Sequence, residues 1–305
     1  MSDEADAGGS QQTWTVLDLL RWTAQHFESR GIETARLDAE LLLAHALGTS
    51  RLRLYLDFEK PVLEEERARF RELVRHRASE RVPVSQLLGE KEFWSLNLKV
   101  SSDVLTPRPD SETLVSAALD RLPDPDGAYR VLDIGTGSGA IALAIAHERP
   151  KAMMTATDIS TAALQIAGVN ADQLQLSDRI RFLEGSLFEP VRGEEFDLVV
   201  SNPPYLARSE AGELPPELDH EPEEALFGGE DGFALLRPLV GAVVAHLVDG
   251  GGFAVELSPG QEDSVAQWCM EAGLVEIETL RDLARQPRVV AARRGARGPQ
   301  RHLED

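Results

Sequence analysis

Cysteine is almost absent from this chain, because Cys269 is the single one among 305 residues. One cysteine allows neither an intrachain disulfide nor a cluster of thiolate ligands around a metal. Histidine offers no metal site either, since no two histidines stand at the i, i+4 spacing of a helical ligand pair. We therefore expect no bound metal. The histidines are scattered over positions 26, 45, 76, 147, 220, 246 and 302.

Basic residues and long apolar runs are also scarce. The chain has 31 Lys and Arg residues against 52 Asp and Glu residues, and its formal net charge is −21. Such a surface repels phosphate, which argues against a protein that holds nucleic acid by counterion release. No apolar run reaches the roughly 18 residues of a membrane-spanning helix. Residues 1–12 lack the basic and apolar parts of a signal peptide. We expect a cytoplasmic protein with no membrane segment.

The first part of the sequence has helical periodicity. Residues 1–12 are small, acidic and polar, and we expect a disordered tail there. Apolar residues then recur at helical spacing over residues 13–82, and Thr15 with Asp18 is typical of a helix N-terminus. These features predict a small N-terminal helical domain. Its predicted helices run from Thr15 to just before Gly31, from 38 to 47 and from 63 to 77.

The period of the pattern changes at Pro83, which we expect to end the helices. Apolar and polar residues alternate from Leu96 to Val100, which predicts a strand of a hairpin. We therefore place a β-hairpin linker at residues 83–106. The next domain is expected at 107–293, followed by a mobile C-terminal tail at 294–305.

From residue 129 onward, short apolar runs alternate with helical stretches. This alternation predicts βαβ units, and hence an α/β fold with a Rossmann-like, doubly wound parallel sheet that has helices on both faces. Ligands in such sheets bind beyond the carboxyl ends of the strands. The predicted strands are residues 130–134, 153–158, 180–183, 196–200 and 252–257.

A glycine-rich turn follows the first of these strands. It reads Gly135-Thr136-Gly137-Ser138-Gly139, so the backbone can approach a ligand closely, and the next helix offers free N–H groups. Asp158 ends the second strand, 19 residues past Gly139, which is near the spacing expected of a carboxylate that binds ribose hydroxyls. The alternative to a ligand-binding turn is a tight strand–helix turn that binds no ligand.

Two classes of ligand fit this turn. Residues 137–142 match the dinucleotide pattern G-x-G-x-x-A. The ligand can therefore be either a nicotinamide or flavin dinucleotide or S-adenosylmethionine. Asp133 precedes the turn and favours S-adenosylmethionine. A carboxylate there would repel a pyrophosphate, but it suits a ligand with an ammonium and a sulfonium group.

The strand predicted at 196–200 leads into Ser201 and then Asn202-Pro203-Pro204-Tyr205. Two prolines cannot extend a sheet because neither has an N–H to donate, but they form a stiff backbone that presents carbonyl oxygens. The side-chain oxygen of Asn202 and the carbonyl oxygen of Pro203 can each accept one N–H of a flat NH2 group. Tyr205 can pack on the face of that group.

This arrangement suits methyl transfer to a conjugated nitrogen, whose lone pair is delocalised and therefore a poor nucleophile. Two acceptors hold the nitrogen in line with an electrophilic methyl group and stabilise the positive charge that develops on it. No histidine or lysine stands near the motif, and none is required if the proton leaves after transfer. A glutamine side-chain amide and the exocyclic amine of adenine or guanine both present such a nitrogen, so both substrates stay open.

Motifs on both sides of the glycine turn carry a family resemblance. Residues 105–115 read Leu-Thr-Pro-Arg-Pro-Asp-Ser-Glu-Thr-Leu-Val, and residues 225–232 read Ala-Leu-Phe-Gly-Gly-Glu-Asp-Gly after Glu221-Pro222. With the glycine turn and Asn202–Tyr205, they stand in the order found in the PrmC/HemK family, the peptide chain release factor glutamine methyltransferases. The resemblance covers roughly residues 13–293.

The resemblance implies a class I S-adenosylmethionine-dependent methyltransferase whose helical N-terminal domain recognises the substrate. It implies methyl transfer to the glutamine of the Gly-Gly-Gln motif in release factors, which are the protein partners. The donor would be bound by Gly135, Thr136, Gly137, Ser138, Gly139, Asp158, Ser186, Leu187 and Asn202. Asn202, Pro203 and Tyr205 would be catalytic, and the glutamine would be held by Asn202, Pro203, Pro204 and Tyr205.

Ser186 departs from the family pattern, which usually has an acid at this position. Ser186 can still form a hydrogen bond but lacks the charge, so the affinity for the donor can be weaker. Three other functions stay open: a ribosomal-protein glutamine methyltransferase, a DNA or RNA exocyclic-amine methyltransferase, and a dinucleotide-binding dehydrogenase. The dehydrogenase would leave Asn202–Tyr205 unexplained.

Residues 207–231 hold nine acidic residues and a single basic one, Arg208. We interpret this stretch as a negatively charged lid that guides a basic protein surface to the site and repels a phosphate backbone. A solvated loop that only keeps the protein soluble is the alternative. No exposed apolar stripe is evident, so we expect a monomer.

Overall fold

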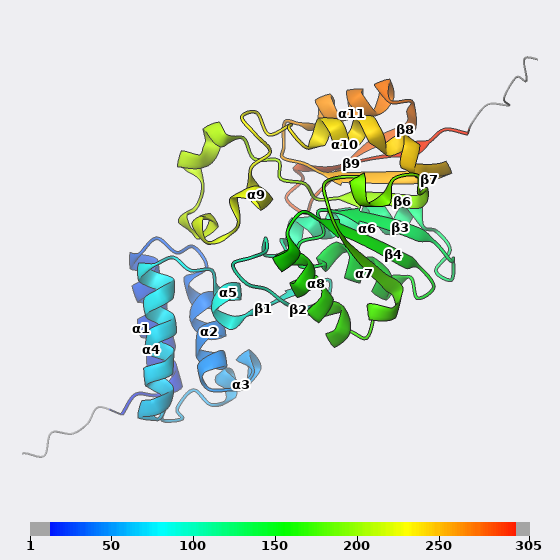
Figure 1. Ribbon diagram of the computed structural model, residues 1–305. Coiled ribbons are helices and arrows are strands. Elements are labelled where there is room, and N and C mark those ends of the chain that lie inside the picture. Colours follow the sequence, from blue (N-terminus) through cyan, green and yellow to red (C-terminus); the bar gives the residue numbers. More distant parts are fainter. Residues whose placement is uncertain (1–12, 297–305) are drawn as a thin grey trace, which may run out of the picture. The chain divides into compact units, whose positions relative to one another are not determined.

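The computed structural model describes residues 13–296. It divides the chain into two compact units, one up to Leu88 and one from Gly89 onward (Figure 1). The tail expected at residues 1–12 lies outside the described residues, as do residues 297–305 of the expected C-terminal tail. Arg294, expected to begin that tail, is the last residue of a strand. Within the described residues, no helix is long and apolar enough to cross a membrane.

The first unit consists of helices around an apolar core. Its first helix begins at the predicted capping box: the Thr15 hydroxyl accepts the Asp18 N–H at 3.2 Å, and the Asp18 carboxylate accepts the Thr15 N–H at 3.1 Å. Buried apolar side chains from several helices, including Leu20, Leu42 and Phe70, form the core. The helices are α1 (Val16–Ser29), α2 (Ala35–Ala46), α3 (Arg51–Leu56), α4 (Glu64–Ser79) and α5 (Val84–Leu88).

The helices α3 and α5 are absent from the sequence-based prediction because each is too short to show a helical period. The sequence predicted that Pro83 ends the helices, and this prediction was wrong. Pro83 stands directly before α5. Leu87 and Leu88 of that helix pack against the core of the first unit. The first unit therefore extends to Leu88, past the expected boundary at residue 82.

The second unit is built on a seven-stranded sheet with the strand order β5-β4-β3-β6-β7-β9-β8. Strand β9 pairs antiparallel with both β7 and β8, and the other neighbours pair in parallel. Strands β4 and β6 flank β3, so the strand order reverses there, which is where a ligand binds in such sheets. The strands are β3 (Arg130–Ile134), β4 (Met153–Asp158), β5 (Ile180–Glu184), β6 (Phe196–Ser201), β7 (Leu247–Glu256), β8 (Leu274–Arg281) and β9 (Pro287–Arg294).

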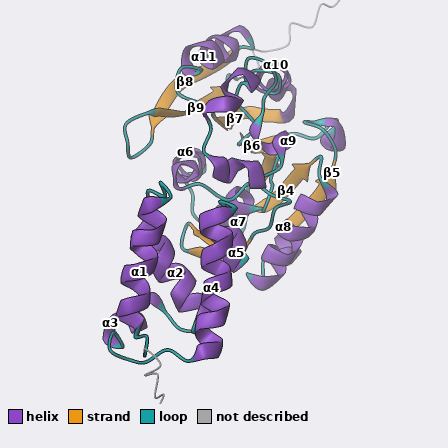
Figure 2. Ribbon diagram, turned by 90° about the vertical axis from the view of Figure 1, so that its left-hand side faces the viewer, coloured by secondary structure: helices purple, strands orange, loops and turns teal. Residues whose placement is uncertain are grey.

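Helices cover both faces of this sheet, and each face has its own apolar core. One core joins the sheet to α6 (Glu112–Arg121), α7 (Ala140–Glu148) and α8 (Thr161–Gln173), and the other joins it to α10 (Leu236–Val243) and α11 (Glu262–Glu271) (Figure 1). Successive residues of a strand point to opposite faces of the sheet and so pack in different cores. In β3, Val131 packs in the first core and Leu132 in the second. Figure 2 shows the same layers from the side. This is the doubly wound α/β fold that the sequence predicted.

A β-hairpin belongs to the second unit. Its strands are β1 (Glu90–Phe93) and β2 (Leu96–Lys99). The side chain of Asn170, on α8, accepts the Lys99 N–H at 2.6 Å and donates to the Lys99 carbonyl at 3.0 Å and the Ser138 carbonyl at 2.8 Å. Asn170 is 1% exposed. One buried amide thus fastens both the hairpin and the glycine-rich turn to α8.

Replacing Asn170 with Ala should lower the free energy of unfolding by about 2 kcal/mol or more, because the buried Ser138 carbonyl and the part-buried N–H and carbonyl of Lys99 lose their partner. Urea unfolding measures this change. The matched control is Asn97→Ala, which removes one exposed hydrogen bond to Glu90 and should shift the free energy by about 0.5 kcal/mol or less. Equal effects of the two substitutions would contradict this account of Asn170.

Candidate active site

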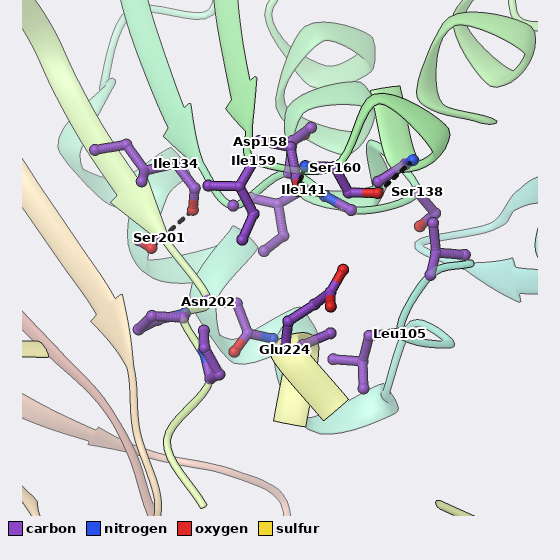
Figure 3. Close-up of a pocket in the computed structure, with 18 of the residues that line it drawn as sticks. Leu105, Ile134, Ser138, Ile141, Asp158, Ile159, Ser160, Ser201, Asn202 and Glu224 are labelled. Carbon is purple, nitrogen blue, oxygen red and sulfur yellow. Dashed lines mark hydrogen bonds between the residues drawn. The ribbon is translucent and has the colours of Figure 1, made fainter. Parts of the chain in front are cut away.

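A pocket opens at the carboxyl ends of the central strands (Figure 3). Residues that end or directly follow β3, β4, β5 and β6 line it, including Gly135, Asp158, Ser186 and Asn202. Figure 3 shows Asp158 and Asn202 on its wall. These residues are far apart in the sequence, but the carboxyl ends of parallel strands meet at one edge of the sheet. The segment before α6, including Leu105 and Arg108, lines the pocket as well.

The glycine-rich turn adopts a backbone that suits glycine. Gly135, Gly137 and Gly139 have φ angles of 72°, 55° and 83°. A Cβ on Gly139 would lie 3.1 Å from the side chains of Ala167 and Leu143, so this glycine lets α7 pack closely against α8. A Cβ on Gly137 would meet nothing within 4 Å, because this glycine borders the open pocket. Thr136 and Ser138 also line the pocket, whereas Gly139 lies behind it.

Asp158 lies on the wall of the pocket and is already held in place by the backbone. Its two carboxylate oxygens accept the Gly137 N–H at 2.8 Å and the Ser160 N–H at 2.9 Å. A carboxylate can accept about four hydrogen bonds. Acceptor capacity therefore remains on Asp158 for two hydroxyl groups of a ligand.

Asp133 lies beneath the glycine-rich turn and does not line the pocket. Its Oδ2 accepts the Thr136 hydroxyl at 2.7 Å, and Oδ1 has no hydrogen-bond partner among the described residues. Complete burial raises the pKa of this carboxyl to about 7, although the Thr136 hydrogen bond favours the charged form. Near neutral pH only part of the Asp133 population is therefore ionised, and Asp133 acts on the turn from below without lining the pocket.

Ser186 and Leu187 line the pocket beyond β5, as the family resemblance implied. Leu187 has a φ angle of 48°, a left-handed conformation that costs free energy for a residue with a side chain. Strain of this kind is frequent at ligand-binding sites.

Asn202, Pro203 and Pro204 line the pocket beyond β6. Ser201, the last residue of that strand, donates its hydroxyl hydrogen to the Ile134 carbonyl at 2.7 Å (Figure 3). The Asn202 Nδ2 donates to the Ser111 Oγ at 3.2 Å. The side-chain oxygen of Asn202 remains available to accept a hydrogen bond.

Tyr205 does not line the pocket. Its hydroxyl donates to the Glu256 Oε1 at 3.1 Å, and its ring packs against the core beneath α10 and α11. Burial and the charge of Glu256 raise the pKa of the Tyr205 hydroxyl, so the phenol stays protonated. The packing of Tyr205 on a substrate amide stays a prediction.

The glycine residues of the second motif hold the backbone of Asn202–Tyr205. A Cβ on Gly228 would lie 2.4 Å from the Pro204 carbonyl oxygen, and one on Gly232 would lie 2.4 Å from the Tyr205 carbonyl oxygen. Both distances are shorter than any real contact, so only glycine fits. The Gln261 side chain adds a hydrogen bond to the Tyr205 carbonyl at 3.0 Å.

The acidic stretch at residues 207–231 is anchored beside the pocket. It includes the short helices η4 (Arg208–Glu213), η5 (Pro216–His220) and α9 (Glu223–Leu226). Glu221 is buried and accepts the Thr106 N–H at 3.2 Å and the Arg108 guanidinium at 2.5 Å. Burial raises the pKa of the Glu221 carboxyl, and the charge of Arg108 opposes this shift. The exposed Glu224 points its carboxylate into the pocket (Figure 3).

Three residues of this site had no role in the sequence-based prediction: Ser111, which holds Asn202; Glu221, which anchors the acidic stretch; and Glu256, which holds Tyr205. Ser111 and Glu221 stand in the family motifs, and Glu256 stands in the strand predicted at residues 252–257; these positions were the only signals for them. Neither composition nor spacing could show which side chain each of them contacts.

Family models match both units of the chain. The PrmC N-terminal domain matches residues 18–89, and the methyltransferase small domain matches residues 111–219. The second unit also resembles a solved methyltransferase from Pyrococcus furiosus, with a TM-score of 0.50 and 20% identity over 67% of this chain and 92% of that one. The fold is that of a class I S-adenosylmethionine-dependent methyltransferase.

Curated relatives match almost the whole chain. A release factor glutamine methyltransferase from Rhodopirellula baltica is 45% identical over 91% of this chain and 96% of its own length. One from Geobacter sulfurreducens is 41% identical over 93% of this chain and 98% of its own length. The chain belongs to the release factor glutamine methyltransferase family.

Replacing Gly228 with Ala should displace the Pro204 carbonyl and lower turnover by about 100-fold, because a shift of about 1 Å in a positioning group can cost that much. Methyl-transfer kinetics measure the change. Gly212→Ala is the matched control, since a Cβ there meets nothing within 4 Å, and it should leave turnover within about twofold of the wild type. Normal turnover in Gly228→Ala would show that the close contact with Pro204 is dispensable.

Proposed function

We propose that this protein transfers a methyl group from S-adenosylmethionine to the side-chain amide nitrogen of the glutamine in the Gly-Gly-Gln motif of release factors. The observation that carries the proposal is the pair of acceptors at the end of β6, the Asn202 side-chain oxygen and the Pro203 carbonyl, in a pocket that can hold the donor. The names of the curated relatives support the same reaction.

The pocket fits S-adenosylmethionine. Asp158 keeps acceptor capacity for the ribose hydroxyls, and the open space at Gly137 lets the donor approach the backbone. Ser186 and Leu187 stand where the adenine is expected. When bound, the donor supplies an electrophilic methyl group. Ser186 offers that adenine a neutral hydrogen-bonding group in place of the usual acid.

The acceptors at Asn202 and Pro203 suit an amide NH2 as the nucleophile. An amide nitrogen gains positive charge as it takes up a methyl group, and two oxygens aimed at its hydrogens stabilise that charge. The Asn202 oxygen is available for this because the amide nitrogen of the same side chain is bonded to Ser111. The polar contacts of the site therefore orient the substrate and stabilise its developing charge.

The charge around the pocket favours a protein substrate over a nucleic acid. Asp103, Asp158 and Glu224 line the pocket along with a single basic residue, Arg108, which is paired with Glu221. Phosphate would be repelled here, whereas a basic protein surface would be attracted. Within this proposal, the helical unit recognises the release factor, and the enzyme acts as a monomer in the cytoplasm.

A methyl-transfer assay with labelled S-adenosylmethionine tests the proposal. Purified release factor, its Gly-Gly-Gln→Gly-Gly-Ala variant, a ribosomal-protein mixture, DNA and RNA are offered in parallel. We expect label on the wild-type release factor alone. Label on the Gly-Gly-Ala variant, on a ribosomal protein or on nucleic acid would contradict the proposed substrate.

Asn202→Ala should lower turnover by about 100-fold or more while donor binding stays nearly intact, because the substrate loses one preorganised polar contact. Single-turnover kinetics and calorimetric donor titration separate the two effects. Asp158→Ala should show the opposite pattern, with weakened donor binding and little loss of turnover at saturating donor. A normal single-turnover rate in Asn202→Ala would refute the role given to its side-chain oxygen.

A further inference from the structure

The orientation of the Asn202 amide depends on one neighbour. Its Nδ2 donates to the Ser111 Oγ at 3.2 Å, and Ser111 is only 3% exposed. Ser111 ends η1 (Pro109–Ser111), a turn that begins with Pro109 and joins the pocket wall to α6. A side-chain amide can rotate by 180° and exchange its oxygen and nitrogen. The partner of Nδ2 therefore decides which atom of Asn202 faces the substrate.

Glu256 lies behind Ser111, at the end of β7, and is 1% exposed. Its Oε1 accepts the Tyr205 hydroxyl at 3.1 Å, and its Oε2 has no hydrogen-bond partner among the described residues. The Ser111 hydroxyl lies beside this carboxyl and lowers the pKa of Glu256. One buried carboxyl thus contacts side chains from both the motif before α6 and the motif after β6.

The charge of Glu256 sets the direction of the hydrogen bonds. An ionised carboxylate only accepts, so beside it the Ser111 hydroxyl can only act as the donor, which leaves a lone pair on its oxygen to accept the Asn202 N–H. A protonated Glu256 can instead donate to Ser111. The Ser111 hydroxyl is then free to donate to Asn202, and the amide can rotate so that its NH2 faces the substrate amide. Two NH2 groups facing each other cannot form a hydrogen bond.

We propose that Ser111 and Glu256 are positioning residues that keep the side-chain oxygen of Asn202 turned toward the substrate. This inference rests on the proposed function, in which that oxygen accepts an N–H of the glutamine. Glu256 does not line the pocket, and Ser111 lines it next to Asn202. They act through Asn202, and Glu256 also holds the Tyr205 hydroxyl.

The surroundings of Glu256 support a titration near neutral pH. Burial raises the pKa of Glu256 to about 7, and the charge of Asp110 adds to this shift. Three groups oppose the shift: the hydroxyls of Ser111 and Tyr205 and the positive charge of Arg288. Arg288 is itself paired with Asp282 and Asp110, and the charge of Arg108 acts on Tyr205. Because the ionised form is the one that orients Asn202, activity should be complete above this pKa and decline as pH falls through about 7.

The test compares Ser111→Ala, Glu256→Gln and the double variant, with Ser116→Ala as the matched control. Ser116 is exposed and bonds only to the backbone of its own helix. For each variant, kcat, the KM for the release factor, the donor Kd and the pH profile of kcat are measured. The two single variants should each lower kcat by about 10- to 100-fold, with the donor Kd within about twofold of the wild type.

The double variant should lose little more than the more impaired single variant, because both changes act through the same bond to Asn202. Glu256→Gln should also lose the decline of kcat between about pH 8 and 6, because glutamine does not titrate. Asp133, with a pKa of about 7 as well, is unchanged in that variant and cannot account for the loss.

Three results would overturn the proposal while the wild-type enzyme labels the release factor: a normal kcat in Ser111→Ala, losses that multiply in the double variant, or an unchanged pH profile in Glu256→Gln. Ser111→Ala removes a single hydroxyl, so it tests the proposal even if Glu256→Gln fails to fold. Absence of label with the wild-type enzyme would instead overturn the proposed function, and this inference with it.

Discussion

The backbone of Asn202–Tyr205 is the constraint on which the rest of the site depends. Pro203 and Pro204 have no N–H, so sheet hydrogen bonds cannot hold this segment once β6 has ended. Other parts of the chain hold it instead: Gly228 and Gly232 lie against its carbonyls, and Gln261 bonds to the last of them. The carbonyl oxygen of Pro203 accepts no hydrogen bond from the described residues, and Pro204 beside it has no N–H to offer. The prolines that break the sheet thus also keep an acceptor free for the substrate.

A second requirement is that the donor pocket and the acceptor motif share one edge of the sheet. Strand β3 carries the glycine-rich turn and pairs with β6, which carries Asn202, so the two motifs are neighbours although they stand far apart in the sequence. The hydrogen bond from Ser201 to the Ile134 carbonyl reinforces this contact at the strand ends. Glu224 of the anchored acidic stretch adds negative charge to the pocket wall, which suits a cationic donor and a basic protein surface.

The sequence predicted the features that rest on local pattern and on sheet geometry. Parallel strands, the glycine-rich turn and the site at the strand ends follow from hydrophobic period and from the rule that the carboxyl ends of parallel strands meet. Contacts between distant segments could not be predicted: Ser111 lies 91 residues from Asn202, and Glu256 lies 51 residues from Tyr205. The helices α3, of six residues, and α5, of five, are too short to show a helical period. Tyr205 fits the family motif, yet its hydroxyl is directed to Glu256 by packing that no local pattern records.

The most direct test of the account is a crystal structure of the protein with S-adenosylhomocysteine and a Gly-Gly-Gln peptide. The account predicts the glutamine amide nitrogen at about 3 Å from both the Asn202 Oδ1 and the Pro203 carbonyl oxygen, with the Asn202 Nδ2 still bonded to Ser111. A glutamine amide bound away from these two oxygens, or an Asn202 amide turned so that its nitrogen faces the peptide, would contradict it.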